Sequence, residues 1–153
     1  MSLGTQFTKL TQPTPYVVTV SFSIASGAGA GSTVQGQFVV NPAQPNLTTA
    51  QLPVPYNEKW AIVDAYATAS PAVDGYLQFS FGLIQQPISY GPLSQTLRSL
   101  YARIKFTPIL LPPNATLQVY YVLIETASAS ATVTANLNIM RLPIDYSGPV
   151  PVF

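Results

Sequence analysis

Apolar and polar residues alternate one by one along much of this chain. In residues 16–24, every second residue from Val18 to Ile24 is apolar, and hydroxyl residues fill most of the positions between. A period of two places alternate side chains on opposite faces of an extended strand, so each such stretch is predicted to be a half-buried β-strand. The stretches are residues 16–24, 33–40, 59–69, 76–84, 97–107, 116–126 and 130–142.

Proline and glycine separate these stretches. Four prolines between residues 42 and 55 predict a loop with at most a short edge strand near Leu52. Asp74-Gly75 predicts a hairpin turn. No segment of helical length carries a helical apolar stripe, and 153 residues suit one domain. We therefore predict an all-β fold, an antiparallel β-sandwich of the eight-stranded jelly-roll type, formed by residues 16–142.

The alternation also predicts which side chains form the core. These are Val18, Val20, Phe22, Leu77, Phe79, Phe81, Ile104, Phe106 and Val119. Along residues 59–69, a strict period places Trp60 and Ile62 on one face, and Ala65 and Ala67 on the other. Residues 108–114 are predicted to turn the chain, because three prolines lie among them.

Residues 1–15 and 143–153 are predicted to be extended arms outside the sandwich, because prolines interrupt both. Unanchored termini are ordinarily polar and poorly ordered. These arms instead carry apolar side chains, which gain most by docking on a neighbouring surface. The predicted inter-subunit contacts are Phe7, Leu10, Val150, Val152 and Phe153. The alternative is that both arms fold back on their own domain.

The composition argues against an enzyme. The chain has no histidine and no cysteine, so it lacks the usual general base, the thiolate nucleophile and the commonest metal ligands. Its five carboxylates form no close pair in sequence. Asp74 is interpreted as a turn residue beside Gly75, and Asp64 as a solvent-facing or ion-paired residue. We predict no enzymatic activity and no catalytic, cofactor-binding or metal-binding residues.

Charged residues are only 7% of the chain, with a net charge of +1. A weakly charged surface favours association, so a homo-oligomer is predicted. Arg103 and Lys105 share a predicted strand face, but six bases offset by five acids attract phosphate weakly, so no specific nucleic acid is expected. No apolar stretch is long enough for a transmembrane helix, and residues 1–16 lack the apolar core of a signal peptide. Two loop sequons predict glycosylation at Asn46 and Asn114.

Residues 59–141 resemble the second half of viral jelly-roll capsid and spike domains. The resemblance rests on the Trp-Ala-Ile-Val strand at 60–63, the turn at 74–75, the Pro-Pro-Asn-Ala-Thr turn at 112–116, and the aromatic and aliphatic strand at 117–122. The Tyr-, Pro- and Thr-rich, charge-poor style is similar to coat proteins of hyperthermophilic archaeal viruses. The resemblance to jelly-roll capsid, penton and spike proteins of icosahedral viruses implies a virion location and symmetric oligomers. It also implies other virion proteins as partners, with a host-surface glycan or receptor as a further candidate.

A second class of function fits the same sequence. An extracellular carbohydrate-binding module, or an adhesive filament subunit, is also a β-sandwich with tyrosine and tryptophan available for ligands. The size in solution separates the two classes. A capsid or spike subunit forms closed symmetric oligomers, whereas a binding module is able to act as a monomer that binds a glycan.

Overall fold

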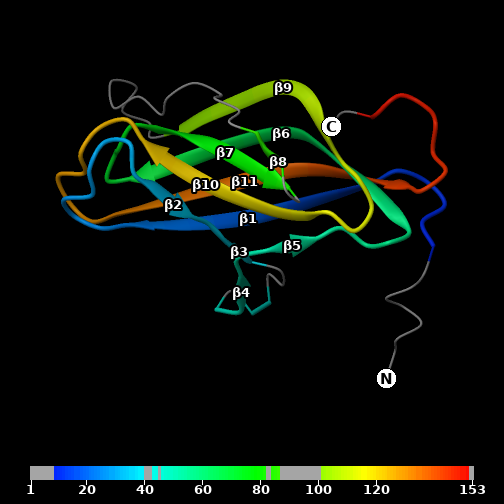
Figure 1. The fold of residues 1–153 in the computed structure, drawn as a ribbon, viewed down its shortest axis with the longest axis horizontal. Coiled ribbons are helices and arrows are strands. Elements are labelled where there is room, and N and C mark those ends of the chain that lie inside the picture. The colour runs from blue at the N-terminus through cyan, green and yellow to red at the C-terminus, as the bar shows by residue number, and fades with distance from the viewer. Residues whose placement is uncertain (1–8, 40–42, 45, 82–83, 87–100, 152–153) are drawn as a thin grey trace.

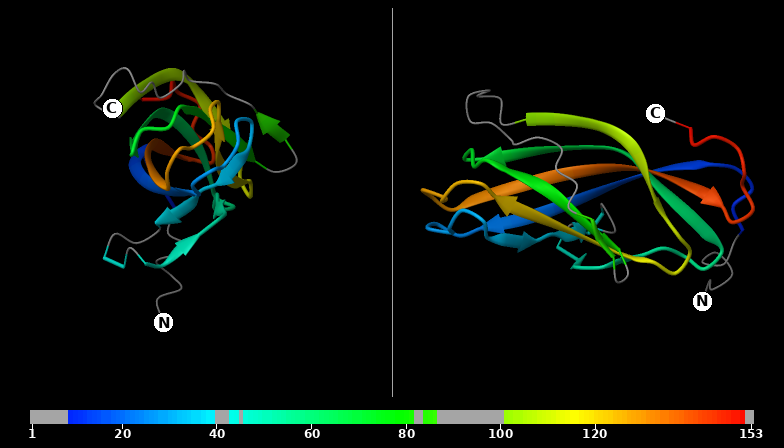
Figure 2. Two further views of the ribbon diagram at one scale, coloured as in Figure 1. Left: turned by 90° about the vertical axis from the view of Figure 1, so that its left-hand side faces the viewer. Right: turned by 45° about the horizontal axis from the view of Figure 1, so that its top comes forward.

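The chain folds into two antiparallel β-sheets. The structure, a computed structural model, describes residues 9–39, 43–44, 46–81, 84–86 and 101–151; for 84–86 and 101–107 it describes the backbone alone. Every regular element in these residues is a β-strand, so none of them forms a helix able to cross a membrane. The sheets lie face to face with the core between them (Figure 1, Figure 2). The predicted all-β antiparallel sandwich is confirmed.

The larger sheet has the order β4-β3-β1-β11-β6-β9. Its strands are β1 (Thr14–Ile24), β3 (Gln37–Val39), β4 (Thr48–Thr49), β6 (Glu58–Ser70), β9 (Tyr101–Leu111) and β11 (Ala131–Pro143). The second sheet has the order β2-β10-β7-β8, and β5 pairs with the start of β10. Its strands are β2 (Thr33–Gln35), β5 (Leu52–Pro53), β7 (Gly75–Phe81), β8 (Ile84–Gln86) and β10 (Thr116–Leu123).

The long strands pair in a nested order. With β3, β4 and β5 set aside, the first strand, β1, pairs with the last, β11, and β2 pairs with β10. Inside these pairs, β6 pairs with β9 and β7 with β8. The chain is thus one long hairpin folded across two sheets. Strands from opposite ends of the sequence consequently lie side by side (Figure 1).

Gly36 lets the chain pass from one sheet to the other. It is the single residue between β2, in the second sheet, and β3, in the first. Its N–H donates to the carbonyl of Val119 at 2.8 Å. A Cβ at this position would overlap the side chain of Val20 and lie 2.7 Å from the ring of Phe22. Only glycine fits this close crossing without moving the core.

Replacing Gly36 with alanine is expected to destabilise the sandwich by about 2 kcal/mol, because the added methyl group overpacks the core. The melting temperature should fall by about 4–8 °C. Gly29→Ala is the matched control, since no atom lies within 4 Å of the added Cβ. Equal melting curves for the two variants would show that the crossing tolerates a side chain.

A β-bulge in β6 changes which of its residues face the core. Val63 is the extra residue, and the register with both β9 and β11 shifts beside it. Trp60 and Ile62 face the core before the bulge, and Ala65 and Ala67 face it afterwards. The prediction that these two pairs lie on opposite faces is wrong, because one inserted residue inverts a period of two.

Pro108 lies within β9, not in a turn as predicted. Pro108 lies where the register between β6 and β9 is interrupted, between the pairs Ile62–Ile109 and Asp64–Lys105, so it occupies no paired position of the ladder. The strand continues to Leu111. The turn comes afterwards, where the N–H of Ala115 donates to the carbonyl of Pro112.

Most of the predicted core residues are buried between the sheets. The buried ones are Val18, Val20, Phe22, Leu77, Phe79 and Val119. Phe81 is half-buried and packs against the core. The side chains of Ile104 and Phe106 lie outside the described residues. The alternation therefore identified the core face of β1, β7 and β10 correctly.

Candidate functional site

The most distinctive surface lies at the end of the sandwich where both arms begin. We define residues 144–151 as the C-terminal strap. The N–H of Tyr146 donates to the carbonyl of Pro143, and its hydroxyl donates to the carbonyl of Pro149 at 2.7 Å. The ammonium of Lys59, on β6, donates to the carbonyl of Tyr146. These contacts fold the strap back over its own domain (Figure 1).

The strap covers part of the outer face of the larger sheet. Beneath it, Ala61 and Val63 of β6 and the outward-facing residues of β11 form a second buried cluster. The β11 members are Met140 and Leu142. Tyr146 and Val150 pack against this cluster from the strap. The middle of β6 and the end of β11 are apolar on both faces because core covers one face and strap the other.

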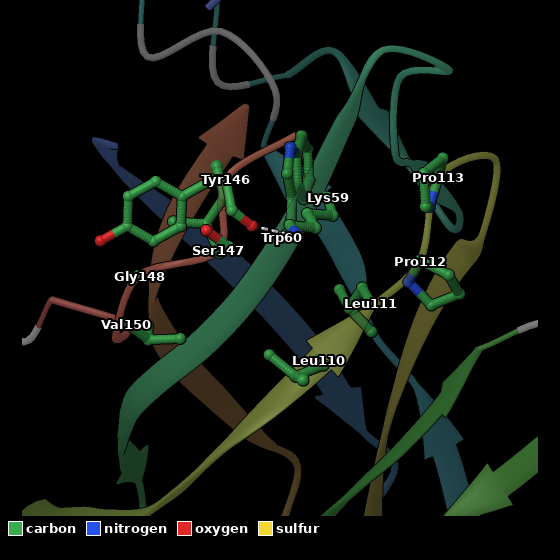
Figure 3. A pocket seen from close by; sticks show the side chains of 11 residues that line it. Lys59, Trp60, Leu110, Leu111, Pro112, Pro113, Tyr146, Ser147, Gly148 and Val150 are labelled. Carbon is green, nitrogen blue, oxygen red and sulfur yellow. Dashed lines mark hydrogen bonds between the residues drawn. The ribbon is translucent and has the colours of Figure 1, made fainter. Parts of the chain in front are cut away.

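An apolar groove of about 430 Å³ opens beside the strap (Figure 3). Its lining residues are Lys59, Trp60, Leu110, Leu111, Pro112, Pro113, Leu142, Tyr146, Ser147, Gly148 and Val150. Leu110 and Val150 border it from β9 and from the strap. Leu110 is 62% exposed. A lining of leucine, proline and tryptophan suits an apolar chain segment rather than a charged ligand.

A buried ion pair closes the core at this same end. Glu58 is only 3% exposed. Its Oε1 accepts hydrogen bonds from Nε1 of Trp60 at 2.8 Å and Nε of Arg141 at 2.9 Å, and its Oε2 accepts from Nη2 of Arg141 at 2.7 Å. The Tyr16 ring lies beneath the guanidinium at 5.9 Å and meets Trp60 edge-on. Three strands, β1, β6 and β11, are thereby tied together, and Trp60 is fixed where it lines the groove.

The electrostatics of this pair keep both groups charged. Burial alone would raise the pKa of Glu58, but the hydrogen bonds from Arg141 and Trp60 and the charge of Arg141 outweigh it and lower that pKa. The hydrogen bond to Glu58 raises the pKa of Arg141. The pair is therefore ionised at neutral pH. Both oxygens of Glu58 accept hydrogen bonds from Trp60 or Arg141, which fits a structural role.

The structure places two of the predicted arm residues. Val150 is half-buried against its own domain, as described above, so this contact exists before any neighbour arrives. Leu10 lines a second cavity together with the strap. Phe7, Val152 and Phe153 lie outside the described residues. The inter-subunit role of all five remains a prediction.

Both sequon asparagines are exposed. Asn46 lies in the turn before β4, and Asn114 lies in the turn between β9 and β10 with a positive φ of 66°. Exposure in a turn is what glycosylation requires, so the two predicted sites are sterically accessible.

The structure brings Asp74 and Glu125 together near Tyr121, although they are far apart in sequence. Asp64 is buried rather than solvent-facing, and its carboxylate accepts from the N–H of Ala65 at 2.9 Å. Asp74 lies in the loop from β6 to β7, where its N–H donates to Oε1 of Glu125 at 3.0 Å. This loop crosses from one sheet to the other, so the predicted hairpin turn at Asp74-Gly75 is wrong. No group of three acidic side chains that could hold a metal ion occurs among the described residues.

Comparison with known proteins adds no relative. No protein-family model matches the chain, and neither does any curated protein. Function is therefore inferred from the strand order and from the groove, the strap and the ion pair at one end of the sandwich.

Proposed function

We propose that the sandwich is a jelly roll and that the protein is a structural virion subunit, a capsid, penton or spike component that forms symmetric oligomers. The nested pairing carries this proposal. A jelly roll is two sheets of four strands made by wrapping one long hairpin. The strand orders β1-β11-β6-β9 and β2-β10-β7-β8 are those that this wrapping produces. The short β3 and β4 extend the first sheet beyond β1.

The arm end of the molecule supports assembly. A groove with an exposed leucine at its edge lies beside the strap, and the strap itself carries a second exposed apolar residue, Ile144. Exposed apolar surface that borders an apolar hollow is typical of a protein contact. The low charge of the chain lets identical surfaces meet without strong repulsion. Other virion proteins are further partners in this proposal.

One observation favours the alternative, an extracellular carbohydrate-binding or adhesive module. The outer face of the second sheet carries Tyr76, Gln78, Gln118 and Tyr120, with Gln35 on the neighbouring β2. The hydroxyl of Tyr120 donates to Gln118 at 2.9 Å. Aromatic rings beside amides are suited to neutral sugars. On a virion, the same face would serve for a host-surface glycan.

Sedimentation velocity of the purified chain separates the two functions. A virion subunit is expected to give one discrete oligomer whose mass is a fixed multiple of the monomer and persists on dilution, because symmetric interfaces close. A carbohydrate-binding module is expected to sediment as a monomer and to bind neutral oligosaccharides. A monomer at every concentration tested would contradict the proposed function.

A further inference from the structure

The groove beside the strap needs an apolar occupant. Its walls come from Trp60, Leu110, Leu111 and Leu142, and the charge of Lys59 is directed to the carbonyl of Tyr146. An exposed leucine on the rim of an apolar hollow this large leaves much of its surface open to water. An extended, uncharged segment with one large apolar side chain matches this lining.

Such a segment begins close by. Lys9 lies 3.9 Å from Asp145 of the strap, and Leu10 lines a second cavity there. This cavity shares only the strap residues 146–148 with the groove, so the strap separates the two. Residues 1–8 have no charged side chain, carry Phe7, and span up to about 28 Å when extended. They provide the chemistry that the groove requires.

The groove and the segment fit best between two copies. Lys9 and Leu10, which lead into this segment, line the second cavity and not the groove. In a closed symmetric assembly each subunit both gives and receives the same contact, so the arm of one copy can serve the groove of the next. We infer that the groove binds residues 1–8 of an adjacent copy, with Phe7 as the anchor. This inference rests on the proposed function, since it names the surface through which the subunits assemble.

Cross-linking tests this directly, because the chain has no cysteine of its own. Thr8→Cys, which keeps the Phe7 anchor, and Leu110→Cys are prepared separately, mixed, and treated with a short bismaleimide reagent. We expect a covalent dimer in the mixture. Thr8→Cys mixed with Ile124→Cys is the matched control. Ile124 is also an exposed apolar residue, but it follows β10 at the other end of the sandwich, and it should give no dimer above background (Figure 1).

A second measurement gives the size of the effect. Phe7→Ser in the full chain should weaken association by about tenfold, which corresponds to about 1.4 kcal/mol. A double variant with cysteine at both 8 and 110 that forms the cross-link only within one chain would overturn the inference. A stable oligomer in which the mixed variants do not cross-link would also overturn the inference. The proposed assembly into oligomers would still hold in that case. A monomer throughout would overturn both.

Discussion

Replacing Arg141 with methionine is expected to destabilise the protein by about 3 kcal/mol at neutral pH. Methionine fills much of the space but leaves the carboxylate of Glu58 buried with only the Trp60 N–H beside it. Removing one partner of a buried ion pair costs about 3–5 kcal/mol, and the partial exposure of Arg141 reduces this. Thermal unfolding should show a melting temperature lower by about 6–12 °C.

At acid pH, the difference in stability between the Arg141→Met variant and the native protein should disappear. The pKa of Glu58 is lowered in the native protein, so the pair stabilises it above the unfolded pKa of about 4.3 and loses that effect as the pH falls through the native value. The stabilities of the variant and the native protein should therefore converge as the pH falls through the lowered pKa of Glu58 in the native state. The double change Glu58→Gln and Arg141→Met should recover much of the loss, because no charge stays buried.

Lys9→Met is the matched control for this ion pair. Lys9 and Asp145 are both largely exposed at 3.9 Å, and such surface pairs contribute little to stability. The melting temperature should hardly change. If Arg141→Met also left it unchanged, the pair at the end of the core would have no stabilising role.

Truncation after Pro143 is expected to destabilise the domain by about 2–3 kcal/mol while leaving an all-β circular dichroism spectrum. The truncation uncovers Met140, Leu142 and their neighbours on β6, and the lost burial outweighs the entropy that the free strap regains. It also removes one wall of the groove, so association should weaken.

Two valines provide the comparison for this prediction. Val150→Ser loses a contact with the covered cluster, whereas Val17→Ser changes a valine that is 54% exposed on β1. Only the first should lower the melting temperature measurably. A shorter deletion of residues 149–153 should weaken oligomers without unfolding the sandwich. An oligomer mass that stays unchanged across dilution would show that the tail plays no part in assembly.

The sequence predicts well what depends on neighbouring residues. The period of two in β1, β7 and β10 identifies strands and their core faces, because alternation follows from backbone geometry alone. The same rule fails in β6, where Val63 is inserted. The sequence does contain one indication of this exception. The unbroken apolar run from Trp60 to Val63 is typical of a strand that is covered on both faces.

The candidate site depends on contacts that are distant in sequence, which local patterns do not specify. Glu58 and Arg141 are 83 residues apart, and nothing near either residue indicates the other. The strap likewise depends on Lys59 meeting the carbonyl of Tyr146 across 87 residues. The apolar composition of residues 143–153 did predict that the tail docks on a surface. It did not distinguish the chain's own sheet from that of a neighbour.

Electron microscopy of the purified chain tests the central claim most directly, because symmetry is visible in the images. Subunits of a virion should appear as closed rings or shells of one symmetry, with the arm ends of adjacent sandwiches in contact. The density of every copy should show the two sheets with the strand orders β1-β11-β6-β9 and β2-β10-β7-β8. Single dispersed sandwiches would contradict this account, and open filaments would favour the adhesive module instead.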